Sequence, residues 1–278
     1  MAKAVAPKET AKVLLVEKDG PIAWLKLNRF KVLNCLNREL LLDINDACES
    51  VARDKKIRVV VIIGSGKVFC AGADLAERRG MTEGETLDYI ALIQKTMRSI
   101  EGMPQPVIAA INGSAFGGGT ELALACDLRV MIDDAQLRLT EVKLGIIPGA
   151  GGTQRLPRLI GKSKAKEMIL TAAPIGAVEG KAIGLIHRVV ARDENEDVSD
   201  GFSESLMKEV RVWAEEIATA APLSLRQAKR AIDQGYDRDL EAGLAIETRC
   251  YLELLNTKDR LEGLAAFQEK RKPAYLGE

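Results

Sequence analysis

The stretch INGSAFGGGTELALACD, residues 111–127, decides the fold class. It begins at the end of an apolar run, residues 106–111, which predicts a buried β-strand. The glycines at 117–119 permit a tight turn, and the apolar run from Thr120 to Cys126 predicts a short helix. A strand that leads through a glycine-bearing loop into a helix is typical of an α/β fold.

The same alternation extends along most of the chain. Strands are predicted at residues 12–16, 22–27, 59–63, 128–132 and 136–139, and helices at 38–53 and 82–100. Thr82 is the expected N-cap of the second helix. From Ser199 onward the pattern predicts helices alone, so we place a boundary in the acidic, polar stretch 193–201, between an α/β part (1–198) and a helical part (199–278).

Length and charge exclude several classes of protein. A chain of 278 residues suits one principal domain with an extension. With 40 basic and 40 acidic residues, no long-range field draws it to nucleic acid or to an anionic membrane. Apolar runs such as 59–63 are far shorter than the ~20 residues that cross a bilayer. Met1–Glu17 lacks the apolar core of a secretory signal, so we expect a soluble, cytoplasmic protein.

Cysteine and histidine usage leaves no candidate metal site. The five cysteines are scattered, with no Cys-x-x-Cys pair, which argues against a disulfide framework or a zinc site. We expect them to be small buried residues. His187 is the only histidine, so a His-based triad or metal cluster has little support and we predict no metal.

Three other well-known motifs are incomplete or absent in this sequence. Gly-Lys-Ser ends at Ser163, but Leu156 stands where a phosphate-binding loop needs glycine. The glycines between 113 and 119 lack the acidic residue that a dinucleotide site carries on a following strand. The chain contains no Gly-x-Ser-x-Gly nucleophile turn.

Two glycine-bearing loops remain, Cys70–Asp74 and Phe116–Gly119, each between an apolar strand and a helix. Both can present free backbone N–H groups. Fixed donors of this kind, aimed at a carbonyl oxygen, stabilise the negative charge that develops on an enolate. The alternative is that these glycines serve only to turn the chain from strand to helix.

Two glutamates accompany these loops. Glu121 follows the triple glycine in an otherwise apolar run, and Glu141 follows the predicted strand 136–139. Glu121 could simply be an acid near a helix N-terminus, stabilised by the helix dipole. Glu141 could be an ordinary exposed turn residue. At the level of single residues, both alternatives stay open.

Taken together, these motifs resemble the enoyl-CoA hydratase (crotonase) superfamily over about residues 12–278. The segment 111–127 is similar to its first signature and 141–154 to its second. Further matches in order lie at 28–29, 69–74, 117–123, 148–156 and 267–271. The segments 140–145 and 257–263 are most similar to methylglutaconyl-CoA hydratase-type members.

The resemblance implies a spiral catalytic core of stacked ββα units over residues 1–198. It also implies an α-helical trimerisation region over 199–278 and a homohexamer built as a dimer of trimers. The expected reaction is the reversible syn addition of water to a trans-2-enoyl-CoA thioester. Coenzyme A is part of the substrate and no cofactor is implied. Isomerisation or carbon–carbon cleavage on the same fold is the alternative.

RNA binding is a further alternative, because one member of the similar branch also binds RNA. The candidate helix, residues 38–53, carries Asp43, Asp46 and Glu49 among its few basic residues. That is not the clustered positive face that phosphate binding requires. We therefore expect no nucleic-acid partner.

Residue by residue, the resemblance implies that the backbone N–H groups of Ala71 and Gly118 bind the thioester oxygen. It implies that Glu121 orients and deprotonates water, that Glu141 delivers the proton, and that Gly149 lies beside the water. Keeping both acids favours hydration. The remaining implied substrate-binding positions are Gly72, Ala73, Asp74, Gly117, Lys31, Phe267 and Lys270. Arg138 is a further substrate-binding candidate, although it departs from the family pattern.

Three positions depart from the family pattern. Phe30 replaces a usual proline and Cys35 a usual alanine, so the first loop is expected to bind coenzyme A a little differently. Arg138 stands where relatives carry a small residue. It either points into the acyl pocket and changes substrate choice, or points outward with no effect on the chemistry.

Overall fold

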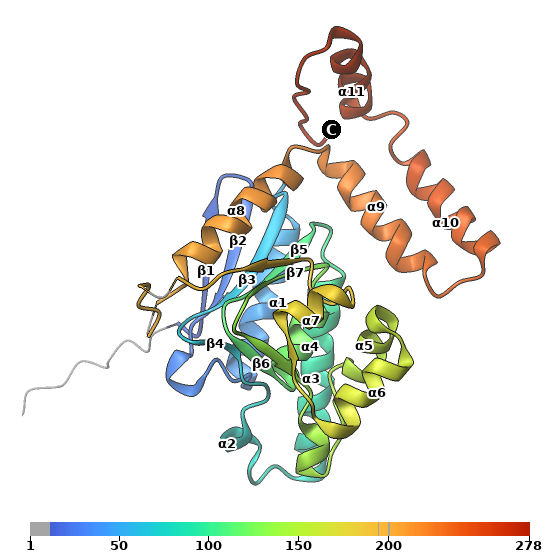
Figure 1. The fold of residues 1–278 in the computed structure, drawn as a ribbon. Helices are drawn as coiled ribbons and strands as arrows, with labels where there is room; N and C mark the ends of the chain where they lie inside the picture. The colour runs from blue at the N-terminus through green and yellow to red at the C-terminus, as the bar shows by residue number, and fades with distance from the viewer. Residues whose placement is uncertain (1–11, 194, 200) are drawn as a thin grey trace, which may run out of the picture.

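Two β-sheets form the centre of the molecule in the computed structural model, which describes residues 12–193, 195–199 and 201–278 (Figure 1). Residues 1–11 of the N-terminal segment and positions 194 and 200 of the predicted boundary lie outside the described residues. The six-stranded sheet has the order β1-β2-β3-β5-β7-β10, and the four-stranded sheet has the order β4-β6-β8-β9. The strands are β1 (Leu14–Asp19), β2 (Ile22–Leu27), β3 (Val59–Gly64), β4 (Val68–Cys70), β5 (Val107–Ile111), β6 (Ser114–Phe116), β7 (Leu128–Ile132), β8 (Gln136–Arg138), β9 (Ile175–Gly176) and β10 (Arg188–Val190).

The chain winds as a spiral. The pairs β3–β4, β5–β6 and β7–β8 each place one strand in the large sheet and the next in the small sheet, and a helical segment follows each pair. Equivalent strands of successive turns pair in parallel. The predicted spiral of ββα units is therefore confirmed. The helices are α1 (Arg38–Ala52), α2 (Leu75–Arg78), α3 (Glu83–Glu101), α4 (Gly118–Leu124), α5 (Gly152–Ile160), α6 (Lys162–Thr171), α7 (Ala177–Ala182), α8 (Glu204–Ala218), α9 (Pro222–Gly235), α10 (Leu240–Leu252) and α11 (Lys258–Glu269), with short 3₁₀ helices η1 (Phe30–Val32) and η2 (Glu141–Leu144).

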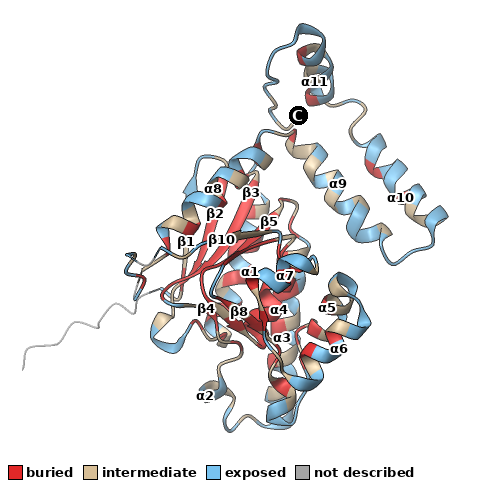
Figure 2. Ribbon diagram, viewed as in Figure 1, coloured by how far each residue is buried: buried red, intermediate tan, exposed pale blue. Residues whose placement is uncertain are grey.

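Both faces of the large sheet are covered, as its apolar strands require. Every residue of β2, β3 and β5 is buried (Figure 2). One hydrophobic cluster joins one face of the sheet to α1 and α3. A second cluster joins the other face to α8, through Leu206, Val210 and Ala214, which lie four residues apart on one helix face.

The packing of α8 bears on the domain boundary. Because α8 shares a hydrophobic core with β2 and β3, it belongs physically with the residues that precede it. The helices that lie apart from the core are α9, α10 and α11 (Figure 1). The packing of α8 supports a division between α8 and α9, and the predicted boundary at 198/199 stays a prediction.

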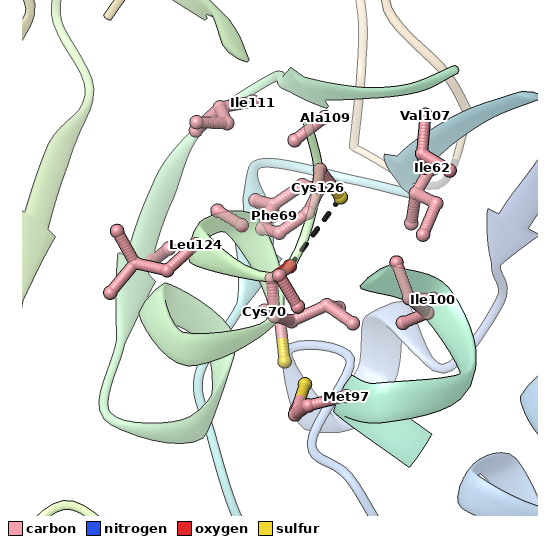
Figure 3. Packing of buried hydrophobic residues seen from close by; sticks show 14 of the residues in the cluster. Ile62, Phe69, Cys70, Met97, Ile100, Val107, Ala109, Ile111, Leu124 and Cys126 are labelled. Atoms are coloured by element: carbon pink, nitrogen blue, oxygen red, sulfur yellow. Dashed lines mark hydrogen bonds between the residues drawn. The ribbon is translucent and has the colours of Figure 1, made fainter. Parts of the chain in front are cut away.

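Helix α4, which begins within the triple glycine, and the residues directly after it pack into the main cluster (Figure 3). Leu124 and Cys126 lie there beside Phe69 and Cys70. The prediction that cysteines are small buried residues is confirmed for Cys48, Cys70, Cys126 and Cys250, whereas Cys35 is only partly buried.

The C-terminal helices are tied to the core by a few polar contacts. Lys229 of α9 forms an ion pair with Asp127 at 2.7 Å, and Asp237 forms one with Arg158 of α5 at 3.2 Å. These helices expose large apolar side chains, among them Ile232, Tyr236, Leu240, Leu244, Tyr251, Leu261, Leu264 and Phe267. Exposed apolar surface of this kind marks a contact face. No helix within the described part of the chain is long and apolar enough to cross a membrane.

Candidate active site

The glycine turn brings α4 against the loop that follows β4. Gly117 has a φ of 48°, a left-handed conformation that favours glycine. A Cβ atom on Gly119 would lie 2.1 Å from the carbonyl oxygen of Cys70, so only glycine allows this approach. As a result, the N-terminus of α4 lies beside the Cys70–Asp74 loop. A Cβ atom on Gly118 would lie 3.5 Å from the backbone nitrogen of Ala73.

Ala73 and Gly118 present two neighbouring backbone donors. Leu36 donates its N–H to the oxygen of Gly72 at 2.8 Å and accepts from the N–H of Asp74 at 3.0 Å. In this parallel bridge the N–H of Ala73 points away from Leu36. None of the described residues accepts a hydrogen bond from the N–H of Ala73 or Gly118. The N–H of Gly118 is free because it belongs to the first turn of α4.

The expectation for Ala71 is wrong. Its N–H donates to the oxygen of Leu33 at 2.9 Å, so it has no donor left for a thioester oxygen. The free donor of this loop is Ala73, two residues further along. Ala73 was expected only to bind substrate in a general sense, because backbone pairing with Leu33 and Leu36 is not visible in the side chains of the loop.

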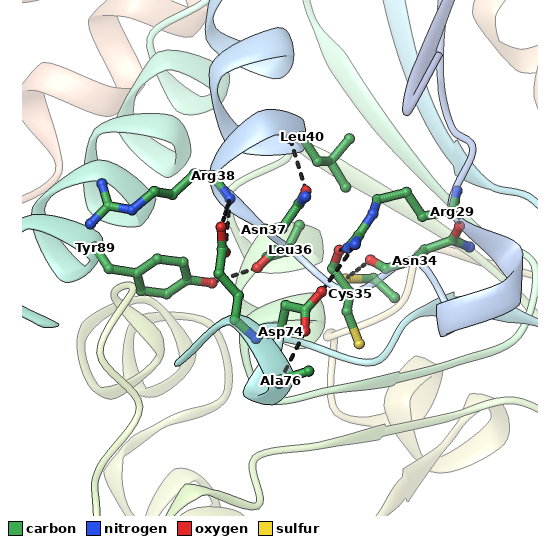
Figure 4. A network of polar contacts seen from close by, with 12 residues as sticks. Arg29, Asn34, Cys35, Leu36, Asn37, Arg38, Leu40, Asp74, Ala76 and Tyr89 are labelled. Atoms are coloured by element: carbon green, nitrogen blue, oxygen red, sulfur yellow. Dashed lines mark hydrogen bonds and ion pairs between the residues drawn. The ribbon is translucent and has the colours of Figure 1, made fainter. Parts of the chain in front are cut away.

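A polar network holds the loop in place (Figure 4). Asp74 accepts a hydrogen bond from Arg29 at 3.0 Å and another from the N–H of Ala76 at 3.1 Å. The hydroxyl of Tyr89 donates to the oxygen of Leu36. The carboxylate of Asp74 is thus engaged in holding the loop and capping α2, which favours a structural role over direct substrate contact.

Glu121 is a buried acid held by an opposing turn. Its side chain is 2% exposed, and its Oε1 accepts from the N–H of Ala150 at 2.8 Å and of Gly152 at 2.7 Å. The pKa of Glu121 is raised to about 7, mainly by burial. The charge of Glu141 also raises it, whereas the hydrogen bonds from Gly152 and Ala150 and the charge of Arg155 lower it. Both protonation states are therefore accessible near neutral pH, as a general base requires.

Glu141 is the first residue of η2 and is not an exposed turn residue. Its exposure is 8%, and burial raises the pKa of its carboxyl group. A Cβ atom on Gly117 would lie 2.9 Å from Oε1 of Glu141, so this acid lies against the glycine turn. Within the described residues, its buried Oε2 has no hydrogen-bond partner. That orphaned oxygen is free to contact a substrate or a water molecule.

Gly149 belongs to the turn that faces Glu121. Its carbonyl oxygen accepts a hydrogen bond from Nε2 of Gln94 at 2.8 Å. The next carbonyl, that of Ala150, accepts from Nη1 of Arg155 at 3.0 Å, and Arg155 also pairs with Glu101 at 2.7 Å. Sequence reasoning missed Gln94 and Glu101. Their spacing of seven residues on the long helix α3, which places both on one face, was the available signal.

Arg138 supports the glycine turn through its backbone. Its carbonyl oxygen accepts from the N–H of Gly117 at 2.9 Å and from the hydroxyl of Thr120 at 2.8 Å. Its guanidinium donates to Oε1 of Gln136 at 2.9 Å, on the face of β8 opposite the buried Leu137. The buried Nε of Arg138 has no partner in the part of the chain that the structure describes.

The remaining predicted positions do not gather around the glutamates within one chain. Phe267 on α11 is 88% exposed, and Lys270 ends that helix in a left-handed conformation with a φ of 56°. Helix α11 lies apart from α4 and α5 (Figure 1). Lys31 is exposed, with its Nζ 6.0 Å from the ring centre of Phe30.

Comparison with known proteins agrees with this arrangement. The family model described as enoyl-CoA hydratase/isomerase matches residues 17–278. The chain belongs to the enoyl-CoA hydratase/isomerase family. It is therefore an enzyme of the crotonase family, and the family implies an acyl-CoA substrate.

Individual members of the enoyl-CoA hydratase/isomerase family are similar over nearly the whole chain. A putative enoyl-CoA hydratase/isomerase of Bacillus subtilis is 47% identical, with 95% of this chain and 98% of that protein covered. The human mitochondrial methylglutaconyl-CoA hydratase is 44% identical over 95% of this chain and 76% of its own length. The crystal structure of an enoyl-CoA hydratase from Bacillus anthracis has a TM-score of 0.89 at 46% identity, covering 96% of this chain and 100% of that one.

Proposed function

We propose that this chain catalyses the reversible syn addition of water to a trans-2-enoyl-CoA thioester. The observation that carries this proposal is the grouping of two buried carboxyl groups, Glu121 and Glu141, with two backbone N–H groups that donate to none of the described residues. One donor is Ala73 of the Cys70–Asp74 loop and the other is Gly118 of the adjoining glycine turn. Hydration of an activated alkene needs both elements.

The donors act on the thioester. Its carbonyl oxygen accepts hydrogen bonds from the N–H groups of Ala73 and Gly118, which draws electrons from the conjugated alkene and makes Cβ electrophilic. As water adds to Cβ, negative charge develops on the same oxygen. Because the two donors are fixed by the Leu36 bridge and by α4, they stabilise that charge without reorganisation.

The acids act on the water. Glu121 removes a proton from the water that attacks Cβ, and Glu141 delivers a proton to Cα on the same face. Burial raises the pKa of both carboxyl groups, to about 7 for Glu121. A pKa near the working pH suits a general base, and a raised pKa helps Glu141 to hold the proton that it delivers. The N–H of Gly149, on the turn that faces Glu121, is the group we place beside the water.

We infer a carboxylated acyl group of the methylglutaconyl type as the preferred substrate. The 44% identity with methylglutaconyl-CoA hydratases supports this choice. Arg138 supports it as well, since its Nε, which has no partner among the described residues, offers a charge-assisted hydrogen bond to a carboxylate. A panel of carboxylated and unbranched enoyl-CoA thioesters tests this inference, and an unbranched preference overturns it.

We also propose a homohexamer built as a dimer of trimers. The exposed apolar residues of α9, α10 and α11 support it. The position of α11, which carries Phe267 and ends at Lys270, apart from α4 and α5 supports it as well (Figure 1). A second copy can bring these residues to a bound coenzyme A. Sedimentation over a range of protein concentrations tests the assembly, and a fully active monomer overturns it.

Product analysis tests the reaction itself. The enzyme is incubated in deuterated water with a short trans-2-enoyl-CoA, and the product is identified by mass spectrometry and NMR. We expect a 3-hydroxyacyl-CoA with one deuterium at Cα, on the face that received the hydroxyl group. A shifted double bond or a cleaved acyl chain would instead establish isomerase or lyase activity.

A further inference from the structure

A continuous line of hydrogen bonds joins α3 to Glu121. Nε2 of Gln94 donates to the carbonyl oxygen of Gly149 at 2.8 Å. The N–H of Ala150 donates to Oε1 of Glu121 at 2.8 Å. The Gly149 carbonyl and the Ala150 N–H are the two ends of one peptide group, so the side chain of Gln94 acts on Glu121 through a single rigid unit.

The geometry of the peptide group lets a hydrogen bond at its oxygen influence the hydrogen bond made by its N–H. A trans peptide is planar and points its C=O and N–H in opposite directions, so holding one end orients the other. A donor at the oxygen also polarises the peptide and makes its N–H a stronger donor, because consecutive hydrogen bonds strengthen one another. The bond from Gln94 therefore both aims and strengthens the bond that Ala150 makes to Glu121.

We propose that Gln94 is a positioning residue for the hydration reaction, which fixes the Gly149–Ala150 peptide and so stabilises the ionised form of Glu121. The inference rests on the proposed function, because the hydration reaction is what makes Glu121 a general base. The side chain of Gln94 is only partly buried and forms its hydrogen bond from the middle of α3, a helix of 19 residues whose core-facing side holds it in place.

The effect of Gln94 on Glu121 can be separated from the effects of the charged groups nearby. Those that face Glu121 are Glu141 from η2 and Arg155 from α5, and Arg155 is paired with Glu101 of α3. Gln94 carries no charge, so replacing it with another neutral residue leaves this set unchanged. A change in the titration of Glu121 then reports the hydrogen bond through the peptide.

The decisive variants are Gln94→Met and Gln94→Lys. Methionine has a similar length and suits a helix but cannot donate, so the ionised form of Glu121 loses support and its pKa rises. Lysine keeps a donor and adds a positive charge, so the pKa falls. Lys95→Met, at the exposed neighbouring position of α3, is the matched control.

We expect Gln94→Met to lower kcat about tenfold, the order of one lost hydrogen bond, with KM unchanged within about twofold. The acidic limb of its pH–kcat profile should move to higher pH, and that of Gln94→Lys to lower pH. Lys95→Met should leave both quantities as in the wild type. An acidic limb that stays in place in Gln94→Met overturns the proposal, because this neutral variant changes the hydrogen bond without changing the charges.

A measurement without turnover separates this inference from the proposed function. In protein labelled with ¹³C at glutamate carboxyl groups, the Glu121 resonance is assigned from its loss in Glu121→Gln. Its titration should shift to higher pH in Gln94→Met. If the wild type hydrated no enoyl-CoA, the proposed function would be wrong, yet this titration would still decide whether Gln94 acts on Glu121. An identical titration curve in both proteins refutes the role of Gln94.

Discussion

Replacing Glu121 with glutamine should make the protein more stable and far less active. Glutamine keeps the shape of the side chain and an oxygen that accepts from the N–H groups of Ala150 and Gly152. It cannot ionise, so it neither removes a proton from water nor places a charge in the buried site. We expect hydration to fall at least ~10²-fold.

The gain in stability follows from the pKa of Glu121. Burial raises it from the ordinary value of 4.5 to about 7 in the folded protein. Between these values the folded state holds a proton that the unfolded chain has lost, so the free energy of unfolding decreases as pH rises. Ionisation of Glu121 therefore lowers the free energy of unfolding of the wild type. This destabilisation is absent below pH ~4.5 and complete above pH ~7, where it amounts to roughly 3 kcal/mol.

Urea unfolding at fixed protein concentration measures this cost. Relative to the wild type, Glu121→Gln should be about 3 kcal/mol more stable at pH 8 and only about 1 kcal/mol more stable at pH 5. The control is Glu209→Gln, at an exposed position of α8, which should change little at either pH. An equal difference at both pH values would refute the assignment of a buried, ionised Glu121 at neutral pH.

Changes at three further positions test other parts of the site. Gly118→Pro removes a donor at the first position of α4, where proline is tolerated, and should lower the rate by ~10²- to 10³-fold with coenzyme A still bound. Gly118→Ala keeps the N–H and meets only ordinary contacts, so it should retain activity, and equal losses in both variants would remove Gly118 from the donor pair. Glu141→Gln should lower hydration at least ~10²-fold, and near wild-type turnover in the folded variant would contradict a two-glutamate mechanism. Arg138→Gly should raise kcat/KM for longer unbranched enoyl-CoA relative to a carboxylated one, by the roughly 1.5 to 3 kcal/mol of a charge-assisted contact, and an unchanged ranking would show that Arg138 does not read the acyl group.

The sequence by itself determined the family and the longer strands and helices of the α/β part. The strands β2, β3, β5 and β7 lie within a residue of their predicted ranges, because their apolar runs require burial on both faces. The start of α3 was also predictable from the sequence, since Thr82 and Glu85, three residues apart, form a capping box. Strand β1 ends three residues later than predicted because its charged end pairs with β2 across the hairpin.

The tertiary structure decided which groups of the site are free to act. Whether Ala71 or Ala73 keeps an unpaired N–H depends on Leu33 and Leu36, which reach the loop only after the spiral has formed. The burial of Glu141, the hold of Gln94 on Gly149 and the packing of α8 against the large sheet depend in the same way on distant segments. Local sequence patterns record burial and turns, whereas a hydrogen-bonding partner or a pKa is set by the residues that the fold brings alongside.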